Sequence, residues 1–329
     1  MKKRFWQIVL WGLAILLLWL LMRTVSLAAV VETLGRLRWW QVGVLALLNG
    51  SVLLALNGRW WLILRGLGYE LPFWQLLGHR LAAFGVSYFT PGPQFGGEPV
   101  QVLLVERLHG VPRSTAIAAV SLDKTVELLL NFTFLAVGVL AVLQAGLFGA
   151  AVGVGTAVWA LLLLLPPLLY LWLVWLGKRP ISGLLSWAQS KVQAGWLDRV
   201  QTAVAHSEAQ MNSLCQHNPR ELMASIIVSL ISWGLLIAEF YSMVTFLGLS
   251  VTGLQLIGLL TAARIAFLLP LPGGLGTLEA SQIWALGLLG FNPAAGIGLS
   301  LLIRARDVLL GLLGLWWGSQ RLKMTWIRP

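Results

Sequence analysis

Charged residues and cysteine are both scarce in this chain of 329 residues. Asp, Glu, Lys and Arg make up 11% of the residues, against roughly 25% in soluble domains. The single cysteine, Cys215, excludes an internal disulfide and a cysteine metal cluster. The sequence contains no G-x-S-x-G or H-E-x-x-H motif and no Walker-type glycine loop. We therefore expect no catalytic site, no metal and no cofactor, and any driving force must come from a gradient or a partner.

Apolar residues dominate instead. They make up 58% of the chain, and the mean hydropathy is +0.82. This is enough for roughly six spans of about 20 residues and two re-entrant segments. Tryptophans recur near the expected span ends, where interfacial anchors lie: Trp39, Trp40, Trp60, Trp61, Trp316 and Trp317. The composition predicts a single all-α polytopic membrane domain over residues 1–329.

The net charge of +11 lies mostly in terminal and loop Lys and Arg. Because no soluble basic domain is present, the charge fits cytoplasmic loops that face anionic lipid better than nucleic-acid binding. The basic residues at both ends of the chain predict that both termini are cytoplasmic. We expect membrane lipids as partners, and no nucleic acid.

One unusual stretch occurs twice, at 88–99 (YFTPGPQFGGEP) and at 269–280 (LPLPGGLGTLEA). Each copy has two prolines, a pair of glycines and a glutamate within apolar sequence, so neither can be continuous helix. A bilayer tolerates broken backbone only where protein or a water-filled cavity covers it. Two broken hairpins at corresponding places of two halves are typical of a transporter binding site. The alternative is a tight turn between two ordinary helices.

Hydropathy and helix-breaking residues divide the chain into segments. A basic N-terminus and a long apolar run favour a retained first span over a cleaved signal peptide. The expected order is a first span at 5–22, an interfacial helix at 23–38, a second span at 40–64, half-helices at 72–89 and 98–110, a long helix at 112–143, an external connection at 146–155, a span at 158–176, an amphipathic cytoplasmic connector at 178–220, a span at 221–247, half-helices at 252–269 and 279–290, and a last span at 293–318.

This order predicts an inverted repeat. The unit at 40–143, made of a span, a broken hairpin and a proline-started helix, recurs upside down at 221–318, because the first hairpin enters from the cytoplasm and the second from outside. Inverted repeats with a binding site at their interface are a common transporter plan.

Half of the twelve acids lie within apolar segments, and four cations accompany them. Each charge costs roughly 2.5–3.5 kcal/mol at mid-bilayer, so partners or water are expected. Spacing of i, i+3 predicts two pairs at matching points of the repeats, Lys124 with Glu127 and Arg304 with Asp307. These pairs are either structural or part of a polar cavity for a lipid phosphate. The charged residues are Glu98, Asp123, Glu127, Glu239, Glu279 and Asp307, with Lys124, Arg264, Arg304 and Arg306.

The hairpin glutamates, Glu98 and Glu279, sit where each returning half-helix begins. There they cap free amides or couple to protons or headgroups, while the glycine amides form an anion cradle. His79 and His109 are expected at the interface. The candidate substrate-binding residues are Thr90, Gly96, Gly97, Glu98, Asp123, Lys124, Glu127, Arg264, Gly273, Gly274, Glu279, Arg304 and Asp307.

Several ordered motifs resemble the lysylphosphatidylglycerol synthase/flippase transmembrane family. They are T-P-G and G-G-E at 90–98, D-K-x-x-E at 123–127, P-G-G-L-G-x-x-E at 272–279 and R-x-x-D at 304–307. The likeness implies a domain of the bacterial inner membrane that moves lipids between leaflets. Lys124 stands where the family leads us to expect arginine, and lysine binds phosphate as a point charge rather than bidentately. Fused members carry a soluble aminoacyl-transfer domain that nothing in this chain resembles, so lipid aminoacylation is not expected.

Three function classes remain open at this point. The first is a flippase or translocase of an anionic phospholipid or isoprenoid lipid, with no enzymatic step. The second is a proton- or ion-coupled carrier of a small anion. The third is an intramembrane enzyme or an accessory subunit for lipid glycosylation or modification. A homo-oligomer and a lipid-modifying enzyme partner both stay open.

Overall fold

The computed structural model describes residues 35–327 except 36, 91–95, 145, 147–153, 190–194 and 270. The expected first span at 5–22 lies outside these residues. So do most of the interfacial segment at 23–38 and of the connection at 146–155, and the middle of the first Pro-Gly break.

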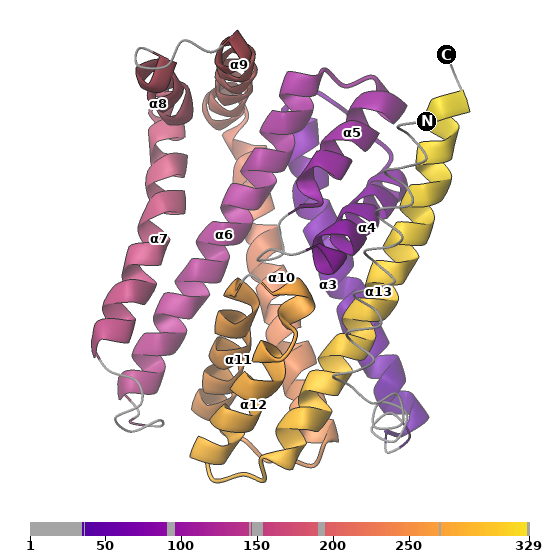
Figure 1. Ribbon diagram of the computed structural model, residues 1–329, viewed down its shortest axis with the longest axis vertical. Helices are drawn as coiled ribbons and strands as arrows, with labels where there is room; N and C mark the ends of the chain where they lie inside the picture. Colours follow the sequence, from indigo (N-terminus) through magenta and orange to yellow (C-terminus); the bar gives the residue numbers. More distant parts are fainter. Residues whose placement is uncertain are drawn as a thin grey trace.

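The described residues form eleven α-helices and one short 3₁₀ helix, with no strand among them (Figure 1). This confirms the prediction of an all-α polytopic membrane protein. Three helices, α3, α6 and α10, are long and apolar enough to cross a membrane, while the total of about six spans stays a prediction. The elements are α3 (Trp39–Gly66), α4 (Phe73–Phe89), α5 (Glu98–His109), α6 (Arg113–Gln144), α7 (Val154–Trp175), α8 (Pro180–Gln189), α9 (Gly195–His217), α10 (Pro219–Phe246), α11 (Gly253–Leu268), η2 (Pro272–Gly274), α12 (Thr277–Leu288) and α13 (Ala294–Ile327).

Glycine ends the two long helices α3 and α10 in the same way. Gly68 and Gly248 have φ of +89° and +80°, a left-handed conformation that glycine adopts without steric cost. The amides of Gly68 and Tyr69 donate to the carbonyls of Arg65 and Leu64, and the corresponding bonds recur after α10. These are Schellman caps, so the sequence position of the glycine sets where each helix stops.

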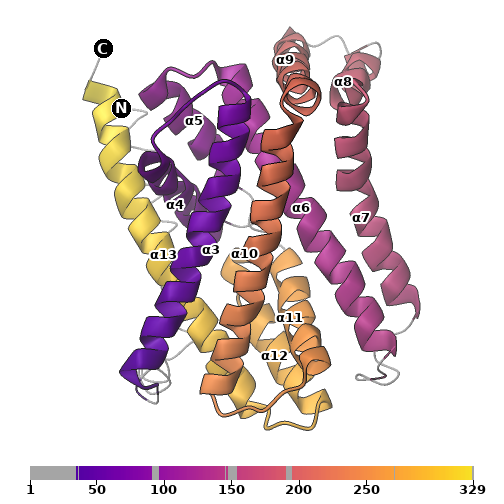
Figure 2. The ribbon, with the colours of Figure 1, turned by 180° about the vertical axis from the view of Figure 1, so that it is seen from behind.

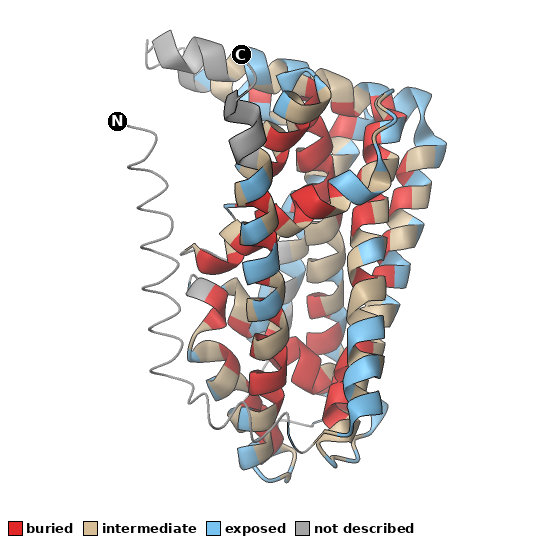
Figure 3. Ribbon diagram, turned by 90° about the vertical axis from the view of Figure 1, so that its right-hand side faces the viewer, coloured by how far each residue is buried: buried red, intermediate tan, exposed pale blue. Residues whose placement is uncertain are grey.

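The outer surface of the bundle is apolar. Helix α7 alone exposes Trp159, Leu165 and Trp172 at 70%, 53% and 58%. A contiguous apolar surface of this kind is rare on soluble monomers and marks a surface covered by lipid. Buried residues lie on the inward faces of the helices along the length of the bundle (Figure 3).

The two broken hairpins enter the bundle from opposite ends. In Figure 1, α4 and α5 occupy the upper half, while α11 and α12 occupy the lower half. Helices α3 and α10 lie side by side (Figure 2), α4 packs along α13, and α11 packs along α6. The hairpin ends meet, because a Cβ on Gly273 would lie 2.9 Å from the Tyr88 ring.

Small residues let α4 and α13 approach closely. A Cβ on Gly314 would lie 1.9 Å from the carbonyl oxygen of Leu81. The same device joins α6 and α11, where a Cβ on Gly138 would lie 2.2 Å from Thr261 Oγ1. Close backbone approach at glycine is a common way for helices to pack within a bilayer. The first hairpin is therefore packed through α4 on α13, and the second through α11 on α6.

Replacing Gly314 with alanine is expected to destabilise the protein. The added methyl meets backbone rather than a flexible side chain, so α4 must move away from α13, at a cost of about 1–3 kcal/mol. Thermal melting in detergent would measure the loss. Gly43→Ala is the control, because Gly43 lies within α3 with no atom within 4 Å of its added Cβ. Equal melting temperatures for the two variants would contradict the close packing.

Helices α8 and α9 occupy the segment predicted as an amphipathic connector. The carboxylate of Glu208 on α9 accepts hydrogen bonds from the Ile181 and Ser182 amides and from the Ser182 hydroxyl at the start of α8. Burial raises the pKa of the Cys215 thiol on α9 to about 11. The thiolate is the reactive form, so this cysteine is inert at neutral pH.

Candidate functional site

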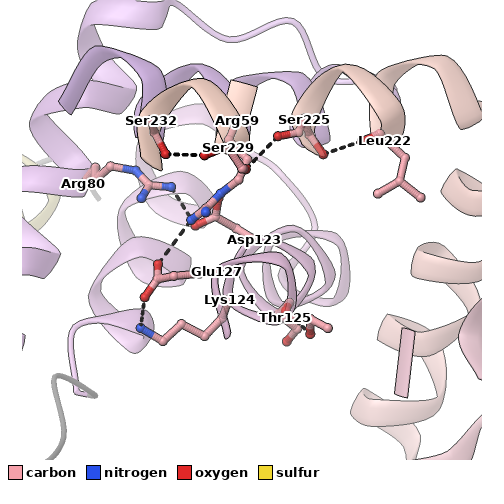
Figure 4. A network of polar contacts seen from close by, with 11 residues as sticks. Arg59, Arg80, Asp123, Lys124, Thr125, Glu127, Leu222, Ser225, Ser229 and Ser232 are labelled. Atoms are coloured by element: carbon pink, nitrogen blue, oxygen red, sulfur yellow. Dashed lines mark hydrogen bonds and ion pairs between the residues drawn. The ribbon is translucent and has the colours of Figure 1, made fainter. Parts of the chain in front are cut away.

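The first polar cluster centres on Asp123 of α6, which is 4% exposed. Arg59 Nε of α3 lies 2.6 Å from one carboxylate oxygen, and Arg80 Nη2 of α4 lies 2.6 Å from the other (Figure 4). Three helices are therefore joined at one carboxylate. Charge-assisted bonds of this length are the strong ones among protein hydrogen bonds.

The cluster continues along α6 toward the first hairpin. Glu127 accepts from Arg59 at 3.2 Å and from Lys124 at 2.7 Å, which confirms the predicted Lys124–Glu127 pair. Lys124 also lies 3.4 Å from Glu98, whose other oxygen accepts the Gly96 amide at 2.8 Å. Three cations and three carboxylates thus neutralise one another.

The second cluster is built around Arg304 of α13, which is 3% exposed. Its guanidinium donates to both carboxylate oxygens of Glu279 on α12, at 2.7 Å for the Nη2–Oε2 bond. It also donates to the carbonyls of Gly273 and Gly274, at 3.2 Å and 2.9 Å. One arginine therefore fixes both the tip of the second hairpin and the start of its returning helix.

The predicted pair of Arg304 with Asp307 is wrong. Asp307 instead accepts from Arg306 Nε at 2.8 Å, and Arg306 Nη1 lies 3.0 Å from Glu239 of α10. The i, i+3 spacing favours a local pair, but Glu279 offers Arg304 both oxygens across the helix interface, the bidentate geometry that guanidinium prefers.

The two glycine amides before α5 do not form the expected anion cradle. The Gly96 amide donates to Glu98, and the Gly97 amide donates to Ser87 Oγ at 2.8 Å. The hydroxyl of Thr90, the residue after α4, donates to the carbonyl of Val86. In this arrangement these donors are already used within the protein.

Arg59 and Glu239 hold corresponding positions in α3 and α10. Arg59 and Glu239 are each the twenty-first residue of a 28-residue helix, counted from Trp39 and from Pro219. Arg59 contacts Asp123 of α6, and Glu239 contacts Arg306 of α13. The signs are reversed, with an arginine in the first half and a glutamate in the second.

Two cavities, with volumes of about 230 Å³ and 170 Å³, are lined in part by these charged residues. The predicted residues Gly97, Glu98, Asp123, Lys124, Glu127 and Arg264 line the first, and Arg264 and Asp307 line the second. The remaining predicted residues line neither of these two cavities: Thr90, Gly96, Gly273, Gly274, Glu279 and Arg304.

Arg264 of α11 is common to both cavities. Its guanidinium lies over the Trp233 ring of α10, 4.8 Å from the centroid. No carboxylate within the described part of the chain lies within ion-pair distance of it. The other cavity cations (Arg59, Arg80, Lys124 and Arg306) each contact a carboxylate. Arg264 is therefore the cavity cation that is open to an external anion.

Sequence reasoning missed Arg59 and Arg80 as members of the site. Arg59 lies within the expected second span at 40–64, and Arg80 lies within the expected half-helix at 72–89. Both are charges inside apolar sequence, which was the signal that singled out the other members. His79 also differs from expectation: it is 1% exposed, and its Nε2 lies 3.0 Å from Nε2 of His109.

The family model described as the lysylphosphatidylglycerol synthase TM region matches residues 6–314. The chain belongs to this family. Membership in the lysylphosphatidylglycerol synthase transmembrane family indicates a lipid-related function in a membrane, and it confirms the resemblance carried by the hairpin and ion-pair motifs. No curated protein and no solved structure matches the chain.

Proposed function

We propose that the protein is a flippase or translocase that moves an anionic lipid between the leaflets of the bacterial inner membrane. The observation that carries this proposal is Arg264, a guanidinium between two cavities with no carboxylate partner in the described residues. The family supports a lipid rather than a soluble substrate.

A lipid phosphate suits the chemistry around Arg264. Guanidinium binds phosphate with two parallel N–H···O bonds. Two unit charges 4 Å apart attract by about 4 kcal/mol at an effective dielectric constant of 20, so this contact offsets part of the cost of bringing a headgroup into the bilayer. Both cavities are also lined by the apolar side chains Leu53, Leu56 and Leu236. These side chains provide an apolar surface for the lipid tails.

In this proposal the buried ion pairs stabilise the packing of the helices, and Arg264 binds the substrate. The charged groups around Asp123 and Arg304 already have partners within the protein. Removing one of them should therefore reduce stability rather than lipid affinity. We take residues 40–143 and 221–318 as two inverted repeats, with 178–220 and both termini on the cytoplasmic side. The protein acts on lipids without a covalent step.

The test is lipid translocation in proteoliposomes with NBD-labelled phosphatidylglycerol or NBD-labelled polyprenyl phosphate, in separate vesicles. Arg264→Gln is expected to lower the translocation rate at least about tenfold, the equivalent of 1.4 kcal/mol of lost phosphate attraction. Its melting temperature should stay near that of the wild type, because the substitution strands no carboxylate. Arg264→Lys should keep part of the rate, because it retains the charge without the fork.

Arg220→Gln is the matched control, since Arg220 is an exposed arginine at the start of α10. Translocation of both lipids by folded Arg264→Gln at the wild-type rate would contradict the proposed function. Uptake of radiolabelled inorganic phosphate with no movement of either lipid would replace it with small-anion transport.

A further inference from the structure

Glu239 of α10 is a buried carboxylate with one unused oxygen. The side chain is 1% exposed, and its Oε2 lies 3.0 Å from Arg306 Nη1. The other oxygen, Oε1, is buried and has no hydrogen-bond partner within the described residues. Buried polar atoms without a partner are uncommon in native proteins and call for a specific explanation.

Arg306 is shared between two carboxylates. It contacts Glu239 on one side and Asp307 on the other, so the three groups carry one net negative charge when both acids are ionised. All three line the second cavity, which Arg264 also lines. A buried anion is costly in a medium of low dielectric constant, and binding one proton would make the group neutral.

Asp123 and Glu279 have no such vacancy. Both oxygens of Asp123 accept from arginines, and both oxygens of Glu279 accept from Arg304. Glu279, for which the sequence left capping and proton or headgroup coupling open, therefore has each oxygen already bonded. A proton on Glu239 Oε1 would displace no existing hydrogen bond.

The surroundings of Glu239 contain few other ionisable groups. Helix α3 offers the second cavity only Asn49, Val52, Leu53 and Leu56, none of which titrates. Helix α9 ends beside the first residue of α10, far along the helix from Glu239. Besides Glu239, the ionisable residues that line the second cavity are Arg264 on α11 and Arg306 and Asp307 on α13, while Glu127 on α6 lines the first cavity.

We propose that Glu239 and Asp307 form a proton-binding site that takes up one proton when an anionic headgroup binds Arg264. This inference rests on the proposed function and names its coupling ion. In the empty protein Arg264 offsets the negative charge of the three-residue group from across the cavity. A phosphate bound to Arg264 neutralises that positive charge, so one uncompensated negative charge would remain in the cavity unless a carboxylate gains a proton.

The step balances as a symport. One lipid anion and one proton enter together from one side, an O–H bond forms on the carboxylate, and both leave together on the other side. No covalent bond of the lipid changes. A lower pH on the side of entry therefore favours loading, and a gradient of one pH unit sustains about a tenfold difference in lipid between leaflets.

The experiment uses the full-length protein in proteoliposomes with whichever of the two labelled lipids the wild type moves. Leaflet distribution is measured by dithionite quenching, and proton entry by a trapped pH-sensitive dye. The wild type should reach about tenfold asymmetry at one pH unit and should carry protons only when lipid is present. Glu239→Gln mimics the protonated acid, so it should equilibrate the lipid to a ratio near one at every gradient, with no proton entry.

Asp307→Asn tests the other acid and should also lose the coupling to protons. It replaces Glu239→Gln in the experiment if that variant is poorly folded. Glu70→Gln is the control, because Glu70 is exposed in the loop before α4 and should behave as wild type. Wild-type lipid movement that ignores the gradient would overturn this proposal and leave the flippase standing, as would full coupling in both variants. A wild type that moves neither lipid would overturn the proposed function itself.

Discussion

Asp123→Ala is expected to yield little folded protein. The substitution strands Arg59 and Arg80, whose side chains are 2% and 11% exposed and which both bind this carboxylate at 2.6 Å. Breaking a buried pair by removing one partner costs about 3–5 kcal/mol. Here two guanidinium groups are left, which is a large share of a typical folding free energy of about 5–15 kcal/mol. Yield after size-exclusion chromatography and thermal melting in detergent would measure the effect.

The matched control is Glu70→Ala, which removes an exposed carboxylate and should melt as wild type. Asp123→Asn separates charge from shape, because the amide keeps one acceptor oxygen but no negative charge. It should be intermediate, since one arginine would still find an acceptor. If Asp123→Ala melted within a degree of wild type, then Arg59 and Arg80 would have water or other partners in the membrane-embedded protein.

The helices could be predicted closely because their ends depend on single residues. Proline at 112 and 293 precedes α6 and α13, and glycine with positive φ closes α3 and α10. Each rule is local, so the expected bounds differ from the observed ones by a few residues in most helices. The last helix was the exception: α13 continues to Ile327, nine residues beyond the expected end at 318.

The ion pairs could be predicted only where both partners lie on one helix. Lys124 and Glu127 are a turn apart on α6, and their pair is present. Arg304 also has an acid a turn away, yet it binds Glu279, which lies on another helix. The spacing of residues in the sequence identifies neighbours on one helix. It does not indicate which other helix packs against that helix. The partner across the interface depends on how the second hairpin sits against α13.

The opposite charges of Arg59 and Glu239 explain why a comparison of the two halves of the sequence did not place Arg59 in the first cluster. The two residues hold equivalent places in α3 and α10, but their charges are opposite. A search for matching residues in the two halves finds the hairpin glutamates and the basic residues of α6 and α13, which keep their sign. It does not find a position that carries a cation in one helix and an acid in the other.

The second large effect is expected at the Arg304–Glu279 pair. Arg304→Met and Glu279→Leu, made singly, each leave one unpaired charge at an interface where Arg304 is 3% exposed. Each single change should therefore cost about 3–5 kcal/mol. The double variant removes both charges and replaces them with apolar side chains of similar volume, a change that is often neutral or stabilising. It should be more stable than either single variant.

The double variant should nevertheless not regain full stability. Arg304 also donates to the carbonyls of Gly273 and Gly274, and methionine cannot replace those two bonds. Leaving a buried acceptor without a donor costs about 1–3 kcal/mol, so a deficit of this order should remain. A double-mutant cycle on thermal or denaturant unfolding measures the coupling directly. Additive losses from the two single changes would mean that Arg304 and Glu279 do not contact each other in the folded protein. A coupling as large as either single loss would instead establish that the arginine of α13 holds the second hairpin closed through this carboxylate.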